Sequence, residues 1–180
     1  MLKLNIGAGN KPLPKADGWV NCDFVVDSRF AGNPDYEWQI GDVTMLPFES
    51  NTADEILASH VIEHIHPTKV EETLAEWFAV LKPGGYISLE QPDLIKCCVN
   101  VLQALTSNDD KMVLQYGMWG LYGNSEREGD YMNHMWGYTP ATLSSLLDEV
   151  GFIDITEETP VVKPWGAQLR DFRLVARKPE

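Results

Sequence analysis

The chain has 180 residues, 44% of them hydrophobic, and its 27 acidic and 14 basic residues give a formal net charge of −13. This length predicts one domain with a proper hydrophobic core, and the lack of clustered lysine and arginine disfavours nucleic acids and anionic membranes as partners. No apolar run approaches the length of a membrane span, and three cysteines without disulfide or zinc spacing indicate a reducing, cytoplasmic setting.

Short apolar runs alternate with turns and helical patterns, which is typical of a mainly parallel sheet with helical crossovers. The expected strands are Leu2–Ile6, Trp19–Phe24, Tyr36–Ile40, Asp54–Ala58, Gly85–Glu90, Phe152–Glu157 and Asp171–Ala176. The early crossovers are short. Only nine residues, two of them proline, separate Gly9 from Trp19, so we expect no full helix there.

Three helices are indicated by apolar periodicity and end signals. The range Thr68–Leu81 opens with a Thr-Lys-Val-Glu capping-box pattern and stops at a Lys-Pro-Gly-Gly run. A second helix is expected between Thr139, as its N-cap, and Gly151. A third, capped by Asp93, is expected over Leu94–Leu105.

A glycine-rich turn follows the first expected strand, where residues 4–10 read Leu-Asn-Ile-Gly-Ala-Gly-Asn. Glycine allows positive φ angles and close approach of a ligand, so this turn predicts a nucleotide-like ligand. The dinucleotide fingerprint would need a third glycine where Pro12 stands, and no Gly-Lys-Ser/Thr follows to make a P-loop. S-adenosylmethionine is the remaining common ligand of such a turn.

The order of motifs resembles the class I S-adenosylmethionine-dependent methyltransferases, especially their small bacterial type. The resembling segments are 4–10, Gly-Trp-Val-Asn-Cys-Asp (18–23), Gly-Asp-Val-Thr-Met-Leu-Pro-Phe (41–48), Ala-Ser-His-Val-Ile-Glu-His (58–64), Val-Leu-Lys-Pro-Gly-Gly (80–85), Tyr-Thr-Pro-Ala-Thr-Leu (138–143) and Val-Gly-Phe (150–152). The resemblance implies a Rossmann-like α/β domain over residues 1–180. Its seven-stranded sheet would have six parallel strands and a last antiparallel one. The reduced helices expected in the first half are a departure, because the family often has a helix where the proline-bearing turn runs. The cofactor would lie across the carboxyl ends of the first strands, which agrees with the switch-point rule.

The resemblance also implies contacts for the methionine half of S-adenosylmethionine. Gly7, Ala8 and Gly9 would let the backbone approach this half of the cofactor. Ser59 and His60 follow the fourth expected strand, so their backbone would line the cofactor's amino-acid end.

For the adenosine half, the resemblance implies two carboxylates. Asp23 would accept hydrogen bonds from the ribose hydroxyls, with Asp27 as a weaker candidate for this role. Asp42 would accept from the adenine amino group while the amide of Val43 donates to the ring, although Asp42 also fits a turn or cap. Asn5 stands where the family often has an acidic residue, and we count it among the cofactor contacts.

Residues 60–64 also match the H-x-x-E-H pattern of inverzincin zinc peptidases. A zinc site there would need a third ligand, for which Glu71, Glu72 and Glu76 are available. The competing interpretation is the usual strand exit of this methyltransferase type. Because Pro67 interrupts any helix within a turn, we favour the strand exit and expect no metal.

Residues 117–138 are expected to form a long loop that is rich in aromatic and histidine side chains. These are Trp119, Tyr122, Tyr131, His134, Trp136 and Tyr138. With the preceding helix it makes an insertion at 94–138 that we expect to be a lid over the methyl acceptor; the alternative is a small satellite core. His134 is the first candidate for a general base, since a histidine pKa can lie near neutrality. Asp93 is the second, with helix capping as its alternative.

The resemblance therefore implies S-adenosylmethionine-dependent methyl transfer to a small-molecule acceptor, with a sugar or glycan precursor suggested by family analogy alone. The alternative is a module that binds S-adenosylmethionine without catalysis and acts in regulation or interaction. Aminopropyl transfer is disfavoured, because it needs an acidic residue where Ser59 and His60 stand. The sequence does not indicate an oligomeric state.

Overall fold

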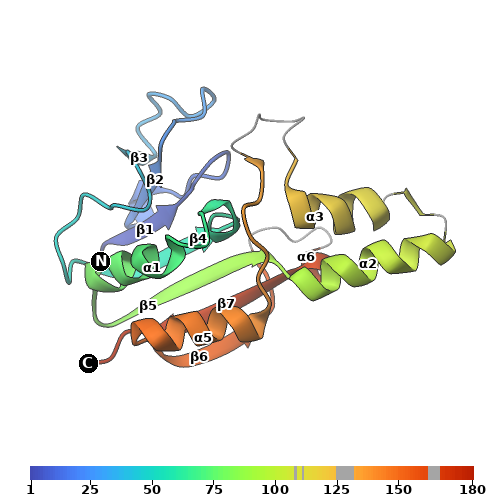
Figure 1. Ribbon diagram of the computed structural model, residues 1–180. Helices are drawn as coiled ribbons and strands as arrows, with labels where there is room; N and C mark the ends of the chain where they lie inside the picture. The colour runs from blue at the N-terminus through green and yellow to red at the C-terminus, as the bar shows by residue number, and fades with distance from the viewer. Residues whose placement is uncertain (108, 111, 125–131, 162–166) are drawn as a thin grey trace.

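The computed structural model describes residues 1–107, 109–110, 112–124, 132–161 and 167–180. Within these residues the seven expected strands form one sheet in the order β3-β2-β1-β4-β5-β7-β6 (Figure 1). Their bounds are β1 Lys3–Ile6, β2 Trp19–Asp23, β3 Glu37–Ile40, β4 Ala53–Ser59, β5 Leu81–Pro92, β6 Ile153–Glu158 and β7 Asp171–Arg177. The first five strands pair in parallel, and β7 runs antiparallel to both β5 and β6. The expected Rossmann-like α/β topology is confirmed.

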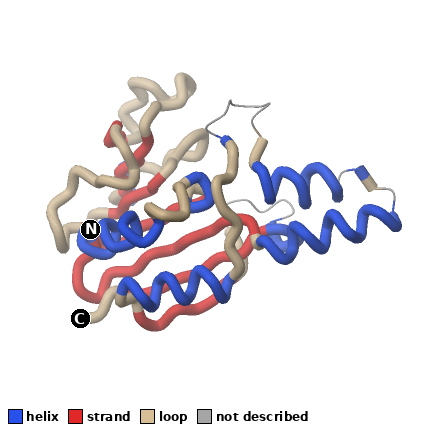
Figure 2. The backbone as a smooth tube through the Cα atoms, in the orientation of Figure 1, coloured by secondary structure: helices blue, strands red, loops and turns tan. Residues whose placement is uncertain are grey.

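Five of the eight described helices lie in the second half of the chain. They are η1 Lys15–Asp17, η2 Ile62–His64, α1 Val70–Val80, α2 Leu94–Ser107, η3 Met112–Met118, α3 Trp119–Tyr122, α5 Pro140–Val150 and α6 Ala167–Arg170. Between β1 and β2 only the one-turn 3-10 helix η1 forms, so the short, proline-bearing crossover excludes a full helix, as expected. Loops connect β1, β2, β3 and β4 in Figure 2, and none of the described helices could cross a membrane.

The helix N-termini agree with the expectations in one case and differ in another. At α5 the capping box is real, because the Thr139 hydroxyl accepts from Thr142 N at 3.1 Å and Thr142 Oγ1 accepts from Thr139 N at 3.0 Å. At α1 the expected capping box is wrong. Lys69 is the N-cap without a side-chain bond, and the Thr68 hydroxyl instead lies 2.9 Å from Nδ1 of His66.

Replacing Thr139 with alanine is expected to lower the free energy of unfolding by about 1 kcal/mol, because the N–H of Thr142 in the first turn of α5 loses the hydroxyl that accepts its hydrogen bond. Thr68→Ala is the matched control and should change it by less than about 0.5 kcal/mol, since Thr68 caps no helix. Urea unfolding followed by circular dichroism measures both values. Equal losses in the two variants would contradict the capping assignment.

Helices α1 and α5 pack side by side on the same face of the sheet (Figure 1). The apolar face of α1 buries Leu74 and Trp77 completely, and α5 buries Leu143 and Leu147. Trp77 also has a positioning role, because its indole Nε1–H donates to the carbonyl of Val43 at 2.9 Å. The core helix thereby anchors the loop that follows β3.

Helix α2 extends away from the end of β5, and α3 lies beside it (Figure 1). The expected long loop over 117–138 is therefore partly wrong, because η3 and α3 make residues 112–122 helical. The physical reason is close packing: a Cβ at Gly120 would collide with the sulfur of Cys97 on α2. Of the expected aromatic group, Tyr138 is buried in the main core, while Tyr131 lies outside the described residues.

Candidate functional site

A cleft of about 1900 Å³ runs along the carboxyl ends of the parallel strands. The carboxyl ends of parallel strands meet at one edge of a sheet, so residues that follow β1, β2, β3 and β4 converge there. The cleft is lined by every residue expected to contact the cofactor and by the first base candidate: Asn5, Gly7, Ala8, Gly9, Asp23, Asp42, Val43, Ser59, His60 and His134. The structure brings these residues together as one candidate site.

The turn after β1 has the geometry that requires glycine. Gly7 and Gly9 have φ angles of 62° and 49°, and a Cβ at Gly7 would collide with the side chain of Val61. The buried carboxylate of Asp23 ties this turn to the end of β2. Its Oδ2 accepts from Gly9 N and its Oδ1 accepts from Phe24 N, each at 2.8 Å.

Two buried asparagines hold the crossover that lacks a full helix. The amide of Asn5 donates to Asn21 Oδ1 at 2.9 Å and to the carbonyl of Lys11 at 3.2 Å. Asn21 in turn pairs with both the N–H and the carbonyl of Leu13, at 2.8 and 3.0 Å. Asn5 lines the cleft, but its side-chain donor bonds serve the loop. This positioning role was not foreseen from the sequence.

The exposed Asp42 makes a local turn at the other end of the cleft. Its Oδ1 accepts from the N–H and the hydroxyl of Thr44, at 2.9 and 2.8 Å. Asp42 therefore makes the turn that its alternative interpretation predicted, and it also lines the cleft. Asp27 is less suited to a ribose, because both of its carboxylate oxygens accept from the guanidinium of Arg29.

The exit from β4 places a strained residue at the floor of the cleft. His60 has a φ of 58°, and its N–H donates to the carbonyl of Glu90 at 2.7 Å. The His60 ring lies between two carboxylates, with Nδ1 3.1 Å from Glu63 and Nε2 3.2 Å from Asp171. Beside it, the buried Ser59 hydroxyl has no hydrogen-bond partner among the described residues.

Asp171, the first residue of β7, is fully buried under this floor. Its carboxylate accepts from the Arg170 guanidinium, with Nη2 3.1 Å from Oδ2, and from His60. Burial alone would raise the pKa of Asp171, but the hydrogen bonds and positive charges of His60 and Arg170 outweigh it and hold this pKa well below its usual range.

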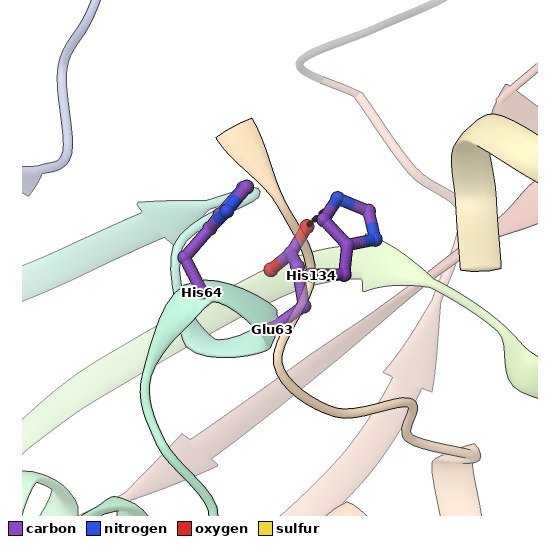
Figure 3. Close-up of side chains that lie close together, drawn as sticks. All are labelled: Glu63, His64 and His134. Atoms are coloured by element: carbon purple, nitrogen blue, oxygen red, sulfur yellow. Dashed lines mark ion pairs between the residues drawn. The ribbon is translucent and has the colours of Figure 1, made fainter. Parts of the chain in front are cut away.

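Glu63, His64 and His134 lie together at the edge of the cleft (Figure 3). His134 Nε2 is 3.9 Å from Glu63 Oε1, and the two imidazole rings stand edge to face with centroids 4.7 Å apart. Burial lowers the pKa of His134 to about 4, although the charge of Glu63 partly opposes this shift. The near-neutral pKa expected from the residue type is therefore wrong, and the ring is neutral at pH 7.

The two base candidates occupy different places. His134 lines the cleft, and its Nδ1 lies 2.9 Å from the carbonyl of Gly120, so this nitrogen carries the proton and Nε2 has the lone pair. Asp93 is absent from the described lining of the cleft. Its Oδ1 accepts from Ile95 N at 2.9 Å, which is the helix-capping alternative, so the structure favours His134.

Comparison with known proteins places this geometry among methyltransferases. The family model described as a methyltransferase domain matches residues 21–89. The chain also superposes on the crystal structure of 1,6-didemethyltoxoflavin-N1-methyltransferase from Burkholderia thailandensis, solved with S-adenosylhomocysteine. The TM-score is 0.65 at 20% identity, over 99% of this chain and 71% of that one. A S-adenosylmethionine-dependent methyltransferase from Methanosarcina mazei gives a TM-score of 0.66 at 19% identity, over 98% and 92%. Residues 21–89 therefore match a methyltransferase domain, and nearly the whole chain has the fold of S-adenosylmethionine-dependent methyltransferases of known structure.

Curated relatives match over shorter stretches. The chain is 45% identical over 49 residues to a ubiquinone/menaquinone biosynthesis C-methyltransferase of Cereibacter sphaeroides, which is 27% of this chain and 19% of that protein. It is 31% identical over 97 residues to the demethylmenaquinone methyltransferase of Paenarthrobacter aurescens, which is 51% of this chain and 38% of that protein. The matches thus span between a fifth and two fifths of these relatives' own length.

Sequence reasoning missed Glu63, Arg170 and Asp171 as parts of the site. One signal for Asp171 was present in the resemblance to class I methyltransferases. If the last strand is antiparallel, its first residue lies at the edge where the parallel strands end, and β7 does pair Asp171 with Pro92 at the end of β5. Glu63 was read only as part of a zinc pattern or a strand exit.

Proposed function

We propose that this chain binds S-adenosylmethionine in the cleft and transfers its methyl group to a small-molecule acceptor. The observation that carries the proposal is the convergence of the Gly7–Gly9 turn, the buried Asp23 carboxylate and the β4 exit on one cleft at the carboxyl edge of a class I sheet. The match of residues 21–89 to a methyltransferase domain supports it.

The residues present fit this cofactor. A Cβ at Gly9 would meet only the Gly7 carbonyl oxygen, at 3.9 Å, so the turn leaves open space beside its backbone there. Asp23 keeps lone pairs beyond those that the Gly9 and Phe24 amides occupy. Ser59 lines the cleft at the end of β4, and its buried hydroxyl has no hydrogen-bond partner among the described residues. Asp42 and Val43 would hold the adenine end.

S-adenosylmethionine supplies a methyl group on a positively charged sulfur, which is already an activated leaving group. The protein's own part is therefore alignment and the exclusion of water. The insertion at 94–138 serves as the acceptor-side wall, and Trp119 of α3 contributes an aromatic side chain to the cleft. The neutral His134 offers Nε2 to an acceptor proton, a role that its lowered pKa weakens.

The acceptor is proposed as a ring-bearing small molecule. The curated relatives are named for quinone methylation, and their names give no support to the sugar that family analogy suggested. Besides Trp119, the lining includes the thioethers of Met132 and Met135, which suit a flat apolar ring better than a polyhydroxylated one.

Titration calorimetry with S-adenosylmethionine and S-adenosylhomocysteine tests the binding step. Wild-type protein should bind both, and Asp23→Asn should weaken binding at least about tenfold, because the ribose hydroxyls lose a charged acceptor. Asp35→Asn, an exposed carboxylate outside the cleft lining, is the matched control and should bind like wild type. No binding by wild-type protein would refute the proposal.

A transfer assay with a radiolabelled methyl group tests the chemistry. Pools of demethylated quinones, aromatic heterocycles and sugar nucleotides would be offered to the wild-type protein. Labelling of a ring compound supports the proposed acceptor, whereas labelling of a sugar nucleotide overturns that part alone. Cofactor binding without transfer to any pool would favour the non-catalytic binding module.

A further inference from the structure

One ligand atom from each of Glu63, His64 and His134 lies within 4.8 Å of the other two (Figure 3). Glu63 and His64 come from the one-turn helix η2, and His134 comes from the segment that precedes α5. The two segments are distant in sequence but meet at the cleft, whose lining includes both histidines. Two imidazoles and one carboxylate are a set of ligands that binds first-row divalent metals.

Both histidines are held in the tautomer that metal ligation needs. Nδ1 of His64 lies 3.0 Å from the carbonyl of Asn133, and Nδ1 of His134 lies 2.9 Å from the carbonyl of Gly120. A carbonyl only accepts hydrogen bonds, so each Nδ1 carries the proton and each Nε2 keeps its lone pair. Histidines that bind metals are oriented by this same kind of outer hydrogen bond.

Glu63 supplies the second, independent observation. Its side chain is 2% exposed, and neither carboxylate oxygen accepts a hydrogen bond of good geometry from the described residues. His60 Nδ1 lies 3.1 Å from Oε1, which gives the carboxylate a nearby charge but leaves both oxygens with unused lone pairs. Buried polar atoms without a hydrogen-bond partner are rare in folded proteins, and both oxygens have lone pairs that a bound cation could use.

The backbone holds the two segments against each other. The N–H of Met135 donates to the carbonyl of Glu63 at 2.7 Å, and the N–H of His134 donates to the carbonyl of Tyr122 at 3.1 Å. Side chains fixed by such contacts need little rearrangement to bind a cation. The 3.9 Å gap between His134 Nε2 and Glu63 Oε1 would close to about 3.4 Å, the separation of two tetrahedral ligands that each lie about 2.1 Å from a metal.

We propose that Glu63, His64 and His134 form a binding site for a first-row divalent transition-metal ion at the edge of the cleft. The nitrogen ligands favour Mn²⁺, Fe²⁺, Co²⁺ or Zn²⁺ over Mg²⁺ and Ca²⁺, which prefer oxygen ligands. This site differs from the H-x-x-E-H pattern considered in the sequence, because the ring of His60 pairs with Asp171 and the third ligand comes from position 134. It also revises the sequence-based expectation of no metal.

Titration of metal-free protein with Co²⁺, followed by calorimetry and by the ligand-field absorption of the ion, tests the site. Excess Mg²⁺ would be present to occupy the acidic surface. Wild-type protein should bind one Co²⁺ with nitrogen ligation visible in the spectrum, and His64→Ala and Glu63→Gln should each lose at least about tenfold in affinity. His66→Ala is the matched control, because this exposed histidine lies outside the cluster and should leave Co²⁺ affinity unchanged.

Equal Co²⁺ affinity in wild type and His64→Ala, or equal losses in His64→Ala and His66→Ala, would overturn the proposal. His64 is only partly buried, so its variant remains informative if Glu63→Gln fails to fold. Calorimetry of the metal-free protein with S-adenosylmethionine keeps the two proposals apart. Binding of S-adenosylmethionine without binding of Co²⁺ would refute the metal site alone. Binding of Co²⁺ without binding of S-adenosylmethionine would refute the methyltransferase proposal alone.

Discussion

Asp171→Ala is expected to lower the free energy of unfolding by about 3–5 kcal/mol, the largest effect among the substitutions considered. The fully buried carboxylate is the shared partner of Arg170 and His60, so its removal leaves positive charge and buried donors without compensation. Urea unfolding at pH 7 measures the change, and Asp35→Ala is the exposed control. A loss of unfolding free energy below about 1 kcal/mol would show that the contacts of Asp171 with Arg170 and His60 stabilise the fold no more than a surface ion pair does.

The Asp171 carboxylate also makes the stability of the fold depend on pH in the acid range. Because the folded-state pKa of Asp171 is depressed, its stabilisation is fully present above the ordinary carboxyl pKa of about 4 and is lost as the pH falls from there through the folded-state pKa. The stability difference between wild type and Asp171→Asn should therefore be largest near neutrality and shrink below about pH 4. A difference that stays constant into acid would contradict the assigned ionisation of Asp171.

His134→Ala is expected to reduce methyl transfer at least about tenfold while leaving the affinity for S-adenosylmethionine unchanged. The reason is its place in the cleft. Nε2 is the nitrogen of a neutral ring that keeps its lone pair, and the residue lies in the insertion at 94–138 and not in the turns that follow β1 and β2. Turnover would be measured on the acceptor found by the labelled-methyl assay, with cofactor affinity measured by calorimetry.

Asp35→Asn, an exposed residue outside the cleft lining, serves as the control for this substitution, and circular dichroism checks that both variants fold. Unchanged turnover in His134→Ala would remove this residue from the mechanism. Loss of cofactor affinity together with turnover would show that His134 supports the cleft as a whole. Loss of turnover alone fits both a base and a metal ligand, because both roles use Nε2; the Co²⁺ titration of His64→Ala separates them.

The strands and the cofactor side of the cleft were predictable because their signals are local. Apolar runs place each strand within a few residues of its observed bounds, and residues such as Gly7 and Asp23 follow strand ends that the sheet topology must bring together. The switch-point rule then needs only a mainly parallel sheet, which the resemblance implied.

The rest depends on contacts that are distant in sequence. His60 and Asp171 lie 111 residues apart, and no periodic pattern links them. The pKa of His134 was misjudged because it depends on burial, which only the packed insertion determines. The error at residues 117–122 has the same origin, since Gly120 favours a loop by composition but allows a helix to pack against Cys97.

The position of β7 between β5 and β6 has a consequence for how the molecule folds. Strand β6 is synthesised before β7, yet it has no hydrogen-bonding neighbour in the sheet until β7 arrives. A nascent chain that stops short of residue 171 therefore lacks both a complete sheet and the negative charge beneath the β4 exit. Completion of the sheet edge that carries Asp171 must therefore wait for the last strand in the sequence.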